Sequence, residues 1–134
     1  MSDGMRRVLA SVGFVLLLVS RADAHHSLPA HYISEQLITV TGVVDEFRYQ
    51  NPHAVIFIVV VDEVGAESLW TVEWAGSGAL RRLGVLPDAI QAGDRVHILG
   101  HPARDGSAGM ALNTISFEDG RASIGPPDRG GEAE

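Results

Sequence analysis

The sequence predicts one mainly β domain (all-β) whose strands close into a small barrel. Short segments rich in β-branched and aromatic residues recur along the chain, separated by Gly, Pro, Asn and Asp, as strands joined by turns are. Between the third and fourth segments the apolar period changes, with Leu80 and Leu83 at helical spacing. Three strands, one short helix and two further strands is the order of a five-stranded OB-like barrel, in which closure removes exposed sheet edges. A β-sandwich or an open half-barrel is the alternative.

Local pattern and turn chemistry give the individual elements. Gly42 lies inside the first apolar segment and indicates a bulge or a sharp bend. Asn51-Pro52-His53 is a turn signal, because proline fixes φ and lacks a donor, and Gly65 lies in a hairpin loop. Ser77 can begin a helix that Gly84 ends. We expect strands over residues 37–49, 54–61, 68–75, 95–100 and 110–117, and helix over residues 77–84.

The first 24 residues are typical of a signal peptide. Two arginines precede an apolar run over residues 8–19, and Ala22-Asp23-Ala24 matches the small-x-small pattern of a cleavage site. The run is shorter than the about 20 residues that a transmembrane helix needs, although an uncleaved membrane anchor is the alternative. Cleavage leaves 110 residues, which we divide into an OB-like domain over 25–121, with an N-terminal arm over 25–36, and a disordered tail over 122–134.

The composition bounds the compartment and the partners. The chain has no cysteine, so neither a disulfide nor lipidation of a cysteine is available to the exported domain. Its net charge is −7, and residues 25–134 hold fifteen Asp or Glu against seven Arg. Binding to a phosphate backbone depends on a basic face, so we expect no nucleic-acid partner. We expect a periplasmic or secreted protein that is not held at a membrane after cleavage.

The histidines are distributed unevenly. Three of the six, His25, His26 and His31, fall within the first seven residues after the predicted cleavage site. Cleavage would give His25 a free α-amine, with an ordinary pKa of about 8, beside an imidazole with an ordinary pKa of about 6.5. One more imidazole would complete the three-nitrogen histidine brace known from several exported copper proteins. Nitrogen-rich sets suit Cu(II), and a tetrahedral set with a carboxylate suits zinc. A frayed, solvated terminus is the alternative.

His53 and Glu73 are the candidates for the remaining ligands. His53 follows a proline and precedes a strand, so its imidazole can be pre-organised, although a turn histidine bonded to a neighbouring carbonyl is the alternative. Glu73 is a carboxylate on an apolar strand between Trp70 and Trp74. It can ligate a metal, orient His53 or simply face solvent, and strand register decides between these roles. Both tryptophans are interpreted as core residues.

The remaining two histidines are predicted to be ordinary surface residues. His97 alternates with Val96 and Ile98 on the fourth strand and is expected to point outward. His101 is placed in a loop directly after the fourth strand, and it is the reserve ligand. Neither is part of the predicted donor set.

Several motifs together resemble a family of small exported bacterial proteins that is classed as a domain of unknown function. The motifs are Ala24-His25-His26-Ser27, Asn51-Pro52-His53, Trp70-Thr71-Val72-Glu73 and Gly93-Asp94-Arg95-Val96, and the resemblance covers nearly the whole mature chain. Leu28 departs from the aromatic residue expected at its position. The resemblance implies export and the extent of the domain, and it supplies no activity to transfer.

The leading functional hypothesis is a periplasmic metal-binding protein, with copper as the first candidate cofactor and zinc as the second. Its predicted ligands are His25, His26, His53 and Glu73. The alternative is a metal-free binding or adaptor module that docks a peptide, glycan or periplasmic protein on a barrel face. A copper-dependent oxidative enzyme ranks last, because a domain of this size leaves little room for a substrate platform. No nucleophile elbow, phosphate loop or HExxH helix occurs, so no catalytic residue is predicted.

Overall fold

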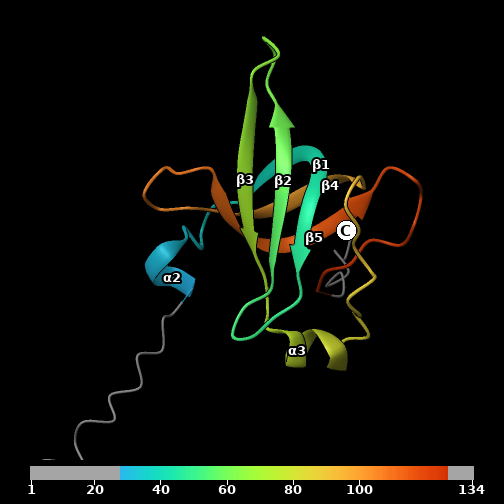
Figure 1. The fold of residues 1–134 in the computed structure, drawn as a ribbon. Helices are drawn as coiled ribbons and strands as arrows, with labels where there is room; N and C mark the ends of the chain where they lie inside the picture. Colours follow the sequence, from blue (N-terminus) through green and yellow to red (C-terminus); the bar gives the residue numbers. More distant parts are fainter. Residues whose placement is uncertain (1–27, 127–134) are drawn as a thin grey trace, which may run out of the picture.

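The computed structural model describes residues 28–126, and within that range five strands close into a barrel (Figure 1). The order around the barrel is β1-β2-β3-β5-β4, and every neighbouring pair is antiparallel except β3 and β5, which are parallel. The five-stranded OB-like barrel predicted from the sequence is therefore confirmed. The strands are β1 (Ile38–Arg48), β2 (Val55–Val61), β3 (Glu67–Glu73), β4 (Arg95–Pro102) and β5 (Gly109–Phe117).

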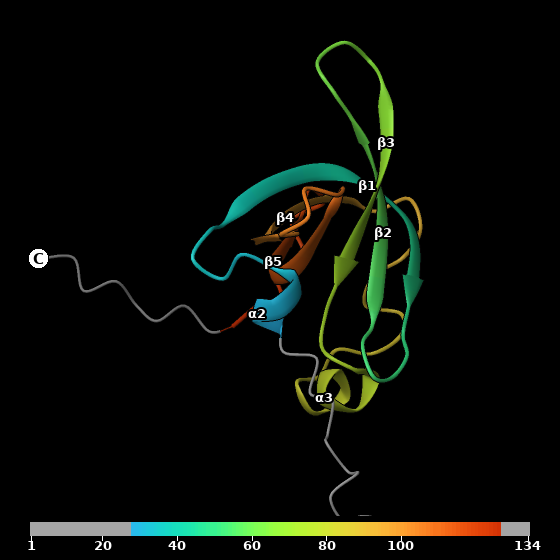
Figure 2. The ribbon, with the colours of Figure 1, turned by 90° about the vertical axis from the view of Figure 1, so that its left-hand side faces the viewer.

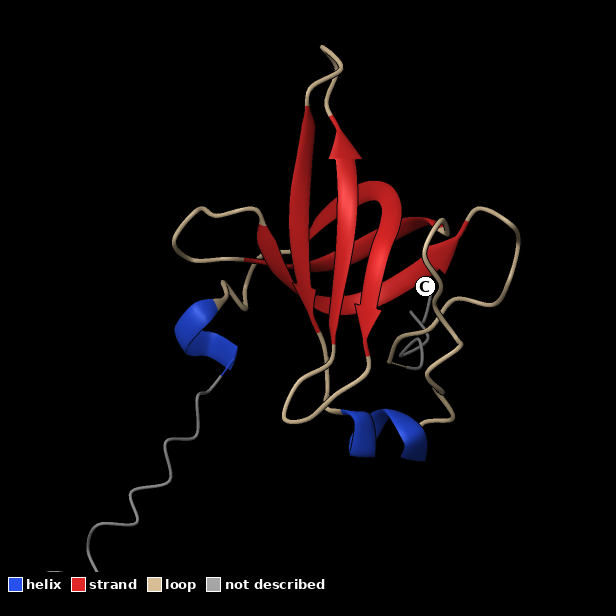
Figure 3. Ribbon diagram, in the orientation of Figure 1, coloured by secondary structure: helices blue, strands red, loops and turns tan. Residues whose placement is uncertain are grey.

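Two short helices accompany the barrel within these residues (Figure 3). α2 (Leu28–His31) lies in the N-terminal arm, and α3 (Ser77–Arg82) lies between β3 and β4, as the spacing of Leu80 predicts. No helix in the described part of the chain is long and apolar enough to cross a membrane.

The barrel closes because β1 bends and pairs with two strands. Its first half pairs with β4 through Val43, and its second half pairs with β2 from Val43 onward. Gly42 lies just before this change of partner, and a Cβ atom there would stand 2.6 Å from the Val59 carbonyl oxygen. The bend predicted at Gly42 is thus present, whereas the register shift of β1 falls between Val44 and Glu46.

The core follows the alternation of the strands. The inward residues of β2, Ile56 and Ile58, are fully buried, as is Val72 of β3. Trp70 and Trp74 are partly buried and pack against this core, as expected. A second cluster of Ala54, Leu80 and Val85 lies beneath α3, which therefore closes one end of the barrel. The other buried members of the main core are Val40, Val44, Ile90, Val96, Ile98, Met110, Ile115 and Phe117.

The N-terminal arm is tied to the end of β4. Tyr32 forms a bridge with Ala103, and the Ile33 amide donates to the Pro102 carbonyl at 3.0 Å. The Arg104 amide donates to the His31 carbonyl at 2.8 Å. Figure 2 shows α2 close to the barrel rather than extended away from it. The arm thus adds a short extra segment of sheet next to the β4–β5 loop.

Two boundaries differ from the sequence-based prediction. β4 continues to Pro102 because His101 and Pro102 pair with β5, so His101 lies on a strand and not in a loop. The ordered domain also extends beyond residue 121. The amide and carbonyl of Ile124 both bond to Ile115 at 2.9 Å, and its side chain packs against the core. The predicted disordered tail therefore begins too early at residue 122, and residues 127–134 lie outside the described range.

Replacing Gly42 by alanine is expected to destabilise the barrel. The new methyl group would have to displace the β2 backbone at Val59, so we expect the free energy of unfolding to fall by about 1–3 kcal/mol. Urea denaturation measures this difference. Gly78→Ala in α3 is the matched control, because no atom lies within 4 Å of a Cβ there. The control should leave stability unchanged or raise it by up to about 1 kcal/mol. Equal stability of the two variants would contradict the close approach at Gly42.

Candidate functional site

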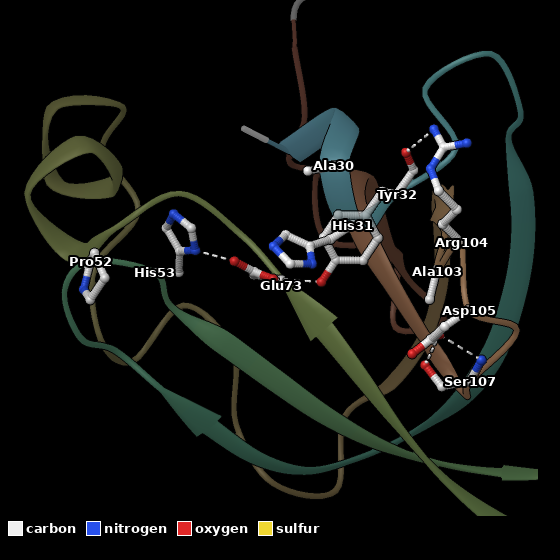
Figure 4. Close-up of a pocket in the computed structure, with 10 residues that line it drawn as sticks. All are labelled: Ala30, His31, Tyr32, Pro52, His53, Glu73, Ala103, Arg104, Asp105 and Ser107. Atoms are coloured by element: carbon white, nitrogen blue, oxygen red, sulfur yellow. Dashed lines mark hydrogen bonds and ion pairs between the residues drawn. The ribbon is translucent and has the colours of Figure 1, made fainter. Parts of the chain in front are cut away.

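A pocket of about 600 Å³ lies where the arm meets the barrel (Figure 4). It is formed by three segments that are far apart in the sequence: the arm, the turn before β2 with the end of β3, and the β4–β5 loop. Its lining residues are Ala30, His31, Tyr32, Pro52, His53, Glu73, Ala103, Arg104, Asp105 and Ser107. Two of the four predicted ligands, His53 and Glu73, therefore line one pocket.

His53 is held by a turn that packs against the start of α3. The Asn51–Pro52 peptide bond is cis, and the Ser77 amide donates to the Gln50 carbonyl at 2.9 Å. The next residue, Ala54, is completely buried and exchanges backbone hydrogen bonds with Trp74 and Ala75. These contacts fix the backbone on both sides of His53, so its imidazole projects from a rigid base, as the proline and the following strand predict.

Glu73 is the last residue of β3 and pairs with Val55 of β2. Val55 points away from the core because its neighbour Ile56 is buried, so Glu73 also lies on the outer face. Its carboxylate contacts the ring nitrogen Nδ1 of His53 through Oε1 and accepts a hydrogen bond of 2.5 Å from the Tyr32 hydroxyl through Oε2 (Figure 4). Both oxygens of the carboxylate are thus engaged.

This pairing determines which nitrogen of His53 is available. An ionised carboxylate only accepts hydrogen bonds, so the Nδ1 atom facing Glu73 carries the hydrogen. In a neutral imidazole the other nitrogen, Nε2, then has a free lone pair. The side chain of His53 is 40% exposed, and Nε2 lies across the ring from the atom that contacts Glu73. A carboxylate that orients a histidine in this way is the usual partner of metal-ligating histidines.

Tyr32 is the residue that joins the arm to this pair. Burial raises the pKa of its hydroxyl above the ordinary value, and the hydrogen bond donated to Glu73 and the charge of that carboxylate raise it further. The phenol therefore stays protonated and keeps donating to Glu73 at neutral pH. Sequence analysis missed Tyr32, because the arm has no periodicity and no local signal reports a partner 41 residues away.

His31 and Asp105 also line the pocket. His31 is exposed at the end of α2. The Arg104 guanidinium donates a hydrogen bond of 3.1 Å to the backbone carbonyl of Tyr32. The hydroxyl and amide of Ser107 donate to Asp105 at 2.7 and 2.9 Å. These bonds lower the pKa of Asp105, with a smaller contribution from His31. The lining of the pocket therefore includes two imidazoles, two carboxylates and one guanidinium.

The structure describes two of the four predicted ligands, His53 and Glu73. His25 and His26 lie outside the described residues. Within residues 28–126, no group of three or more His, Cys, Asp or Glu side chains stands close enough to hold a metal ion.

The two other histidines have partners of their own. His97 Nδ1 lies 2.8 Å from the Thr41 hydroxyl, and its Nε2 lies 3.7 Å from a Glu118 oxygen. His101 Nδ1 lies 2.8 Å from the Gln36 carbonyl, so it helps to hold the end of the arm. Both histidines therefore have structural contacts away from the pocket.

The family described as "Family of unknown function (DUF6152)" matches residues 14–112, which is most of the chain. The chain belongs to this family. The resemblance to a domain of unknown function is confirmed. The matched region includes the arm, the His53 turn and β3 of this DUF6152 protein. No curated protein matches the chain in sequence.

Solved structures similar to this DUF6152 chain include two single-stranded DNA-binding proteins. The mitochondrial protein Rim1 from S. cerevisiae is 12% identical, with 62% of this chain and 93% of that chain covered and a TM-score of 0.48. The small protein from Streptomyces coelicolor is 20% identical, with 67% and 98% covered and a TM-score of 0.41. This likeness concerns the fold and assigns no ligand to the DUF6152 chain.

The comparisons do overturn one expectation, the exclusion of nucleic acid as a partner. The two solved structures named above are of single-stranded DNA-binding proteins, whereas the expectation rested on the acidic net charge of the chain alone. The physical reason is that net charge sums over the whole chain. Single strands are bound by a local groove and by aromatic platforms, neither of which net charge reports.

Tyr32 should ionise at unusually high pH. The absorbance change near 295 nm, measured for the wild type and for Tyr32→Phe, isolates this phenol by difference, and we expect its midpoint above the ordinary value of about 10. Because the folded-state pKa is raised, the contact stabilises the fold below pH about 10 and this stabilisation is lost as pH rises through the folded-state pKa. A midpoint at or below about 10 would show that Tyr32 does not donate to Glu73.

Proposed function

We propose that this protein binds a metal ion, copper first and zinc second, at the junction of its arm and barrel after export to the periplasm. The proposal rests on one observation: residues of the arm and His53 line the same pocket. Had the arm been on the far side of the barrel, the N-terminal histidines and His53 would have had no common site.

Few residues separate His25 from the part of the arm that lines the pocket. Ala30, which lines the pocket, is five residues from His25. Because α2 begins at Leu28, only the three residue steps from His25 to the helix can extend, and they span at most about 11 Å. The proposal therefore requires His25 to fold back toward the pocket that Ala30 and His53 both line, so that its nitrogen atoms meet Nε2 of His53.

The donor chemistry favours copper over zinc. The α-amine and imidazole of a processed His25, together with Nε2 of His53, would supply three neutral nitrogens, the donor type that Cu(II) prefers. His26 is the reserve imidazole. Glu73 would orient His53 and raise the basicity of its ring through Nδ1 rather than bind the metal itself, since both of its oxygens are engaged. The protein would then bind and buffer or deliver the ion.

The decisive property is the dependence of copper affinity on the free α-amine that cleavage would give His25. Cu(II) should bind to protein that begins at His25 at least about tenfold more tightly than to the same protein with its α-amine acetylated, because an acetylated nitrogen cannot replace the amine as a neutral donor. Isothermal titration calorimetry with competing glycine measures both affinities. Equal affinity would remove the proposed role of the amine.

Substitutions of His53 and Glu73 distinguish the residue that binds the metal from the residue that orients it. His53→Ala should abolish the tight site, and Glu73→Gln should weaken it by about 10–100-fold, the usual effect of removing an orienting partner. His97→Ala is the matched control, because it removes an exposed histidine on β4 that contacts Thr41 instead of the pocket. If His97→Ala and His53→Ala reduce copper affinity equally, binding is a general property of surface histidines and the proposed site is wrong.

A further inference from the structure

The hairpin formed by β2 and β3 projects beyond the barrel, as Figures 1 and 2 show. β3 pairs with β2 along its whole length, from Glu67 to Glu73. Its pairing with β5 on the other side covers only Thr71, Val72 and Glu73. Within residues 28–126, the edge of β3 over residues 67–70 therefore has no strand beside it.

The direction of the backbone groups along this edge follows from strand alternation. The Thr71 amide donates to the Ala108 carbonyl at 3.0 Å, on the side away from β2. Alternate residues of an antiparallel strand point the same way, so the N–H and C=O groups of Leu69 and Glu67 also point away from β2. These two residues present two donors and two acceptors, which is the pattern that an added strand uses.

The edge is held in place by its turn. The Asp62 carboxylate accepts hydrogen bonds from the amides of Val64 at 3.0 Å and Ala66 at 2.8 Å. Gly65 provides the positive φ of 86° that the turn requires. Because the turn is fixed in this way, the edge can accept a strand without first paying the entropy of ordering the hairpin.

The same end of the hairpin is apolar on its outer face. Leu69 pairs with Val59 and is 54% exposed, and Val61 is 57% exposed. The core requires only the inward residues Ile56 and Ile58, which are fully buried. The outward apolar residues of β2 and β3 are therefore not needed by the barrel and can contact a partner beside the edge.

The charge of the hairpin restricts the partner. Residues 55–73 contain four acidic residues and no lysine, arginine or histidine. Glu63 and Glu67 are both exposed at the projecting end. A partner segment with basic residues is attracted by these carboxylates, and an acidic one is repelled.

A second copy of the hairpin fits this edge poorly. Two-fold antiparallel pairing centred on Glu67 would place two carboxylates directly opposite each other, which is destabilising. Moving the centre toward Leu69 would bring the partner's turn onto Ala108 and Gly109, which already pair with Thr71. An extended segment without a turn avoids both conflicts.

We propose that the free edge of β3 at residues 67–70 binds an extended segment of a partner protein, in which an apolar residue and a lysine or arginine stand two residues apart on one face. The backbone of the segment bonds to Glu67 and Leu69. Because Glu67 and Leu69 share the outer face of β3, an apolar side chain of the segment packs on Leu69 and a basic side chain two residues away, on the same face, lies beside Glu67. This surface lies at the opposite end of β3 from Glu73, so it operates independently of the metal proposal.

The test uses two capped peptides of equal length in which every second residue is threonine. The positions between the threonines alternate valine with arginine in one peptide and valine with glutamate in the other. Amide hydrogen exchange and chemical shifts of the ¹⁵N-labelled protein report where each binds. We expect the arginine peptide to slow exchange of the Glu67 and Leu69 amides at least about tenfold, and the glutamate peptide to have no effect. Absence of protection at millimolar arginine peptide overturns the proposal.

Charge-reversed variants distinguish this edge from general attraction to an acidic protein. Glu67→Arg should weaken the arginine peptide at least about tenfold and allow the glutamate peptide to bind. Asp88→Arg changes the net charge by the same amount at an exposed position outside the hairpin, and it should leave binding unchanged. Equal loss in both variants, or shifts confined to residues outside the hairpin, would show non-specific attraction and overturn the proposal.

Discussion

The carboxylate of Glu73 joins the three segments that form the pocket. It contacts His53 with one oxygen and accepts the Tyr32 hydroxyl with the other, so the arm, the turn before β2 and the end of β3 are held by a single side chain. Without it, the arm would still bond to the β4–β5 loop through its backbone, but the orientation of His53 would be unspecified. The proposed chemistry depends on that orientation because it selects which ring nitrogen is available.

The barrel makes this arrangement possible by placing Glu73 next to the turn. β2 and β3 pair in a register that sets Glu73 opposite Val55, two residues after His53. A slip of one residue would turn Glu73 inward and leave His53 without its partner. The register is fixed by the buried residues Ile56, Ile58 and Val72, so the core specifies the site indirectly.

The strands and the candidate residues His53 and Glu73 were predictable because they depend on local signals: alternation, a proline turn and an acidic residue in an apolar strand. Tyr32, the end of β4 and the pairing of Ile124 were not, because each depends on contacts between distant segments that leave no period in the sequence. The exclusion of nucleic acid as a partner failed for a related reason. It rested on the net charge of the whole chain, which does not report the properties of one local surface. The free edge of β3 is also a result of topology: β3 and β5 overlap over only three residues.

The proton on the His53 ring tests the central claim most directly. Nitrogen-resolved NMR of this ring in the processed protein, recorded before and after adding Zn(II), identifies the protonated nitrogen and the one that binds metal. The account predicts a hydrogen on Nδ1 in both states and a zinc-induced shift of Nε2. A hydrogen on Nε2, or a ring that does not respond while zinc is in excess, would contradict it.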